Sequence, residues 1–117
     1  PGIPIGITTN LTVNLIDVKE KRIFELSRLI KILNNNNVFA IKDDAFNHIK
    51  NGGFLVSRCF ISSEKVINSL KTDKNTTYLV SSNGEYLDYD SNLFHVKHEN
   101  FKINKDDIRH IDVINVK

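Results

Sequence analysis

An Asn-Gly turn in the last third of the chain constrains the fold more than any other sequence feature. Asn83-Gly84 lies between two runs of alternating apolar and polar residues. This dipeptide is typical of a two-residue type I′ turn joining antiparallel strands. It predicts a hairpin in which the opposed pairs are Tyr78–Tyr89 and Val80–Leu87. Later strands are predicted at 93–99, 101–103 and 111–116. The C-terminal part is therefore predicted to be a β-meander.

Strands and helices alternate in the preceding part of the chain. Alternation at 11–15 predicts a strand, and apolar residues every three or four positions from Ile23 to Leu33 predict an amphipathic helix after Asp17. Apolar runs at 38–41 and 54–61 predict two more strands, each followed by a short helix. We predict an α+β fold, with a mixed, mainly antiparallel sheet and about three short helices packed on one face.

The domain organisation follows from the length of the chain and the placement of Pro and Gly. With 117 residues the chain is long enough for one domain with its own core. Residues 1–9 are apolar and interrupted by Pro and Gly, so we expect an N-terminal apolar arm. Residues 10–117 are predicted to form the single α+β domain.

Composition argues against several classes of protein. The net charge of +2, with both signs interspersed, does not favour nucleic-acid binding. The sequence has no apolar run long enough to span a membrane, which favours a soluble, cytoplasmic protein. The five glycines form no dinucleotide-binding or phosphate-binding fingerprint, and we expect no cofactor. Abundant Asn, Ile and Lys indicate an AT-rich genome, such as that of a phage or virus.

The hairpin face opposite its predicted core indicates a binding surface. Leu79, Tyr86 and Asp88 alternate with the core positions and are expected to share that face. Exposed aromatic and aliphatic side chains are typical of protein-binding patches. The leading prediction is therefore a non-enzymatic interaction or regulatory domain whose partner is a protein.

A ribonuclease is the first alternative. His95 and Lys97 share one face of a predicted strand, where they could act as general base and phosphate clamp without a metal. His48, in the second predicted helix, could be a second catalytic histidine, and Arg58 a further phosphate clamp. The predicted order of elements, helices before an antiparallel sheet, resembles that of small ribonuclease domains of bacterial toxins. RNA would then be the partner.

A metal site is not predicted. His95, His98 and His110 carry the right donors for zinc, but His95 and His98 point to opposite faces of a regular strand. Asp88 and Asp90 followed by His95-Val96-Lys97 faintly match a metal-dependent nuclease core. There His95 replaces the second carboxylate, and the Mg²⁺ site loses an oxygen ligand.

One segment resembles a known family. Residues 38–46, Val-Phe-Ala-Ile-Lys-Asp-Asp-Ala-Phe, are similar to the first signature of fasciclin-type adhesion domains, and residues 108–114 to the second. The Pro-Thr of that signature is replaced here by Ile41-Lys42. The resemblance implies a secreted adhesion module, which the sequons at Asn10 and Asn75 would suit. This is the second alternative.

Overall fold

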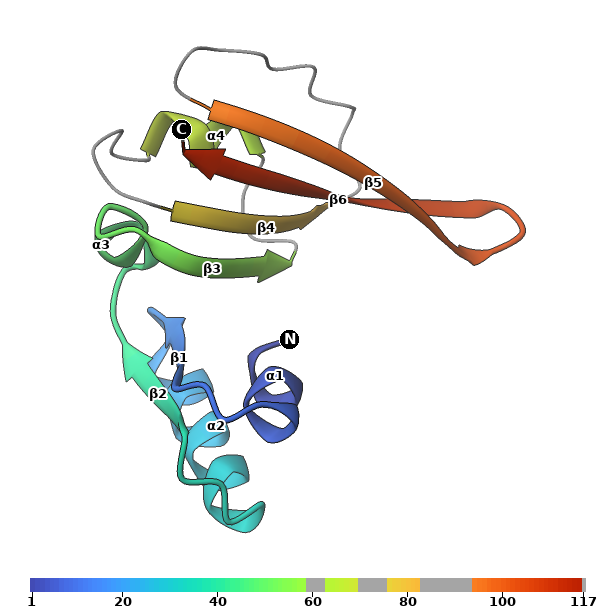
Figure 1. The fold of residues 1–117 in the computed structure, drawn as a ribbon. Coiled ribbons are helices and arrows are strands. Elements are labelled where there is room, and N and C mark those ends of the chain that lie inside the picture. Colours follow the sequence, from blue (N-terminus) through green and yellow to red (C-terminus); the bar gives the residue numbers. More distant parts are fainter. Residues whose placement is uncertain (59–62, 70–75, 83–93, 117) are drawn as a thin grey trace. The chain divides into compact units, whose positions relative to one another are not determined.

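The computed structural model describes residues 1–58, 63–69, 76–82 and 94–116. They form two compact units, Pro1–His48 and Ile49–Lys117, and each unit is described by itself. Each is built around a pair of parallel strands joined through a helix (Figure 1).

The first unit is a small βαβ arrangement with a helix before it. Its elements are α1 (Gly2–Thr8), β1 (Val13–Asp17), α2 (Glu20–Ile32) and β2 (Val38–Lys42), followed by α3 (Ala45–Ile49). The strands β1 and β2 run parallel, with Val13 opposite Val38 and Asp17 opposite Lys42. The most covered side chains of α2 are those of the predicted apolar stripe, Ile23, Leu26 and Ile30.

Asn37 joins the end of α1 to the start of β2. Its side-chain amide donates to the carbonyl oxygens of Gly6 and Leu11, both at 2.8 Å. Its own carbonyl accepts the N–H of Val13 at 2.8 Å. Earlier in the same asparagine run, Asn34 adopts a left-handed conformation with φ of 50° and ends α2. The run therefore forms the turn that its composition predicts.

Gly6 allows α1 to lie close against the sheet. A Cβ atom at Gly6 would stand 2.1 Å from the Cγ2 methyl of Val38, which is 3% exposed. Val38 is β-branched and buried, and cannot easily move aside. The residues predicted to form an apolar arm thus make a helix packed on β1 and β2.

We expect Gly6→Leu to destabilise the first unit. Overpacking a filled site costs about 1–3 kcal/mol, which outweighs the better helix propensity of leucine, about 0.8 kcal/mol. Hydrogen exchange of the amides in residues 1–48 measures the effect. Thr8→Leu puts the same side chain on an exposed position of α1 and serves as control. Equal protection in both variants would contradict close packing at Gly6.

The second unit is a four-stranded mixed sheet with one described helix. Its elements are β3 (Gly53–Arg58), α4 (Ser63–Ser69), β4 (Thr76–Ser82), β5 (Phe94–Asn104) and β6 (Asp107–Val116). The strand order is β3-β4-β6-β5; the first pair is parallel, and the other two pairs are antiparallel. The long strands β5 and β6 form a hairpin about a turn at Lys105 and Asp106 (Figure 1).

The core of this unit lies between α4 and one face of the sheet. Val66 and Ile67 of α4 and Tyr78 and Ile114 of the sheet are at most 3% exposed. Tyr78 and Ile114 are opposed in the β4–β6 register, so they share this face. Burial raises the pKa of the Tyr78 hydroxyl.

The α+β class and the mixed sheet are confirmed, but the predicted meander is wrong. Both edges of β4 are already paired, since Tyr78 lies opposite Leu55 on one side and Ile114 on the other. The predicted Tyr78–Tyr89 pairing is therefore excluded. Residues 83–93, with the Asn-Gly turn, lie outside the described part of the chain. In the described part, no helix is long and apolar enough to cross a membrane.

Candidate functional site

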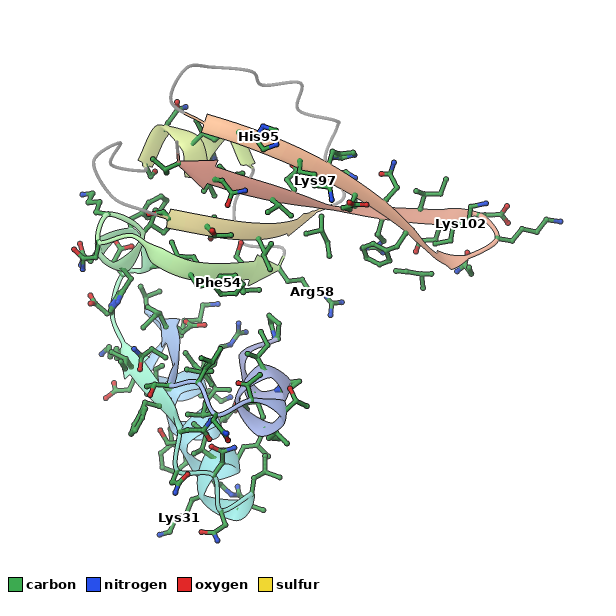
Figure 2. The ribbon with its side chains drawn as sticks, in the orientation of Figure 1. Lys31, Phe54, Arg58, His95, Lys97 and Lys102 are labelled. Atoms are coloured by element: carbon green, nitrogen blue, oxygen red, sulfur yellow. The ribbon has the colours of Figure 1, made fainter. Side chains whose placement is uncertain are left out.

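The residues predicted for a ribonuclease do not converge within the second unit. His95 and Lys97 are exposed on β5, and Lys97 forms an ion pair with Glu99 at 2.8 Å. Arg58 ends β3, the opposite edge strand (Figure 2). Three strand spacings separate these edges, about 14 Å in a regular sheet. His48 belongs to the first unit and pairs there with Asp43.

The predicted protein-binding patch is described only in part. Leu79 is half-buried on β4 and lies on the sheet face opposite Tyr78. Its cross-strand neighbours are Val56 and Val113. Tyr86 and Asp88 lie outside the described residues.

A different polar cluster occupies the carboxyl ends of β1 and β2. Asp17 is the last residue of β1, and Asp43 directly follows β2. The Asp43 N–H donates to the Asp17 carbonyl at 3.1 Å, so the two strand ends are held together. In parallel α/β sheets, ligands bind outside the carboxyl ends of the strands.

The Asp17 side chain is held in one orientation at this edge. Its Oδ1 accepts the Lys19 N–H at 2.8 Å, and its Oδ2 lies 3.5 Å from Arg22. The side chain of Asp17 is 22% exposed, and that of Arg22 is 60% exposed. A carboxylate offers about four acceptor positions, so acceptor capacity remains for a ligand hydroxyl. The next residue, Val18, exposes an apolar side chain, at 60%.

Asp43 organises the loop after β2. Its carboxylate accepts hydrogen bonds from the Asn47 side chain at 3.1 Å and the Asp44 N–H at 2.7 Å, and lies 2.8 Å from His48 Nε2. These contacts hold the pKa of Asp43 below its usual range. The hydrogen bond from Asn47 is the largest cause, followed by those from Asp44 and His48. Asp44 accepts the Phe46 N–H at 2.9 Å and so caps α3. Asp43 is thus a positioning residue.

We expect Asn47→Ala to raise the pKa of Asp43. The Asn47 hydrogen bond is the largest single cause of the lowered pKa. Because this pKa is lower in the folded chain, Asp43 stabilises the fold above its unfolded pKa. That contribution is lost as the pH falls through the folded pKa. Carbon-detected NMR titration of the Asp43 carboxyl measures the shift. An unchanged pKa in Asn47→Ala would contradict the role given to this hydrogen bond.

Asp17 and Asp43 were not predicted as site residues from the sequence. In the sequence, Asp17 stands before the predicted amphipathic helix, and Asp43 follows the apolar run at 38–41. The available signal was their common context, since each follows a short apolar strand and the two strands are joined through one helix. That βαβ pattern places both acids at one sheet edge.

Solved structures with the same fold are methyltransferases by description. One is an rRNA methylase from Streptococcus thermophilus, with 13% identity and a TM-score of 0.54, covering 90% of this chain and 73% of the other. A second is a candidate methyltransferase from Streptococcus mutans in complex with SAH. It has 14% identity and a TM-score of 0.55, covering 91% of this chain and 76% of the other. A third is a candidate rRNA methylase from Clostridium thermocellum, with 18% identity and a TM-score of 0.57, covering 89% of this chain and 72% of the other. The chain therefore has a methyltransferase-like fold.

The family follows from the sequence itself. Residues 1–113 match the family described as GidB: rRNA small subunit methyltransferase G. The match spans nearly the whole chain, and the chain belongs to this family. Comparison with curated proteins gives no significant match.

Family membership overturns the functional predictions. The family is one of enzymes, so the prediction of a non-enzymatic interaction or regulatory domain is wrong. The ribonuclease toxin and the fasciclin-like adhesion module are equally replaced, because the match covers the segments on which both were based. Of the predicted partners, RNA is the one that agrees with the family.

Proposed function

We propose that this chain acts in S-adenosylmethionine-dependent methylation of small-subunit rRNA, and that the carboxyl ends of β1 and β2 bind the nucleoside part of the cofactor. The observation that carries the proposal is the Asp17 carboxylate, oriented at the common carboxyl edge of two parallel strands. The rRNA substrate rests on the family description.

The donor set at this edge fits a nucleoside. A ribose presents two neighbouring hydroxyl donors, and a carboxylate at the end of a βαβ strand is the usual acceptor for them. Asp17 has that position and keeps acceptor capacity beside the Lys19 N–H. Because Arg22 is mostly exposed, its contact with Asp17 is weak enough to yield to a ligand.

The neighbouring groups supply a surface for the base. Val18 follows Asp17 directly and is exposed, so it can contact one face of a purine ring. The Asp43–Asp44 loop stands beside it and is fixed by the Asn47 and His48 contacts. We assign Asp17 to the ribose, Val18 to the base, and Asp43 to holding the loop in place.

S-adenosylmethionine, when bound, supplies an electrophilic methyl group. The described residues contribute binding and orientation of its nucleoside end, which keeps the donor in one position while the RNA approaches. SAH, present in the Streptococcus mutans structure, is S-adenosylhomocysteine, the product left after methyl transfer.

Methyl transfer from labelled S-adenosylmethionine tests the proposal. The purified protein is incubated with unmethylated small-subunit rRNA, with large-subunit rRNA as matched control. We expect label in the small-subunit rRNA alone. Binding of S-adenosylhomocysteine without label in either RNA would contradict the substrate but keep the cofactor site. If the protein neither binds S-adenosylhomocysteine nor labels either RNA, the whole proposal is overturned.

A further inference from the structure

We propose that His98, His110 and Asp112 of the second unit bind a zinc ion. The three residues form a compact cluster on β5 and β6, and none of them is among the residues assigned to cofactor binding. Their possible ligand atoms, one from each residue, all lie within 4.8 Å of one another.

Strand register explains the cluster. His98 lies directly opposite Asp112 in the β5–β6 pairing, and His110 stands two residues before Asp112 on the same strand. All three side chains therefore project from one face of the sheet. His98 Nδ1 is 2.5 Å from Asp112 Oδ1, and the two imidazole rings have centroids 4.6 Å apart. Paired strands hold these side chains on a rigid support.

Burial makes a cation at this place favourable. Asp112 is 1% exposed, and the side chain of His98 is 12% exposed. A carboxylate taken out of water is costly unless it is paired or coordinates a metal. A divalent ion would compensate the carboxylate charge and use all three side chains.

The donor types suit zinc. Two imidazole nitrogens and one carboxylate oxygen are ligands that zinc accepts, and three protein ligands leave one position for water. Tetrahedral bonds of about 2.0–2.2 Å place neighbouring donors about 3.3 Å apart. The His98–Asp112 contact would therefore widen by less than about 1 Å on binding. His95, on the opposite face of β5, is not part of the cluster.

Zinc titration of the whole chain tests the proposal. The protein is treated with chelator, dialysed and titrated with ZnCl₂ by calorimetry; Co²⁺ then serves as a spectroscopic substitute. We expect one ion per chain and the visible bands of tetrahedral Co²⁺. We expect His110→Ala to weaken binding by about 100-fold or more, since loss of even an outer-shell partner costs 10–100-fold. His95→Ala is the matched control and should bind as the unaltered chain does.

Three titration results would overturn the proposal. They are no stoichiometric zinc binding by the unaltered chain, equal loss of binding in His95→Ala and His110→Ala, and full binding by His110→Ala. Titration of the unaltered chain does not depend on whether a variant folds. Thermal stability that follows pH but ignores zinc would show that the cluster is a proton-linked ion pair only, which also rejects the metal site.

Discussion

Asp17→Asn is expected to weaken binding of S-adenosylhomocysteine by about 10- to 100-fold while leaving the fold intact. Hydrogen bonds to a charged group contribute about 1.5–3 kcal/mol, and each 1.4 kcal/mol is a factor of ten in affinity. The asparagine oxygen can still accept the Lys19 N–H, which is 2.8 Å from Asp17 Oδ1, so the strand end keeps its shape. Isothermal calorimetry measures the change.

The control for this variant is Glu20→Gln. Glu20 begins α2 three residues later, and its carboxylate is 86% exposed and 3.8 Å from Lys42. The substitution removes the same charge close to the proposed site without touching the proposed ribose acceptor. We expect unchanged affinity. Equal weakening in both variants would mean that net charge matters and Asp17 makes no specific contact. Unchanged affinity in Asp17→Asn would reject the assignment of Asp17.

Ile114→Ala is expected to lower the free energy of unfolding of the second unit by about 2–5 kcal/mol, the usual cost of emptying a buried aliphatic site. Ile114 is 0% exposed, on the central strand β6, opposite Tyr78. A cavity there loses contacts with the sheet, and close-packed surroundings refill it only partly. The predicted loss is a large fraction of the stability of a domain this small.

The chain offers its own probe and control for this measurement. It has no tryptophan, and its three tyrosines all lie after residue 49, so tyrosine fluorescence in urea reports on the second unit alone. Ile108→Ala, on the same strand but 60% exposed, should change stability by less than about 0.5 kcal/mol. Similar losses at the two isoleucines would contradict the described packing of β6.

Local patterns predicted most of the elements of this fold. Alternation, period-3.6 spacing and apolar runs place β1, α2, β2 and β3 close to their observed bounds, and Gly52 and Gly53, which adopt positive φ angles, follow α3. These signals depend on neighbours along the chain, which the sequence displays directly.

Strand pairing was the part that local patterns could not predict. The Asn-Gly dipeptide is a strong local hairpin signal for β4 and the next segment of the chain. In the sheet, however, β4 pairs in parallel with β3 and antiparallel with β6, and β5 lies between β4 and β6 in the sequence. Such pairings depend on the burial of Tyr78 and Ile114 against α4, a tertiary effect that spacing along the chain does not display.

The candidate site was missed for a related reason. Asp17 after an alternating strand also suits a helix cap, and only the parallel pairing with β2 brings it next to Asp43. His98 and Asp112 are likewise 14 residues apart, and the β5–β6 register alone places them opposite each other. Within one strand, the nearest histidine to His98 is His95, and its side chain points to the opposite face. Spacing along that strand therefore predicts no metal site.

Mapping S-adenosylhomocysteine onto the protein by NMR tests the central claim most directly. Amide shifts are followed in a ¹⁵N-labelled sample during titration, with adenosine as a ligand that shares only the nucleoside. Both ligands should shift residues 17–19 and 42–44, at the carboxyl ends of β1 and β2. Shifts confined to residues 94–116, or no shift at saturating ligand, would contradict a nucleoside site at these strand ends.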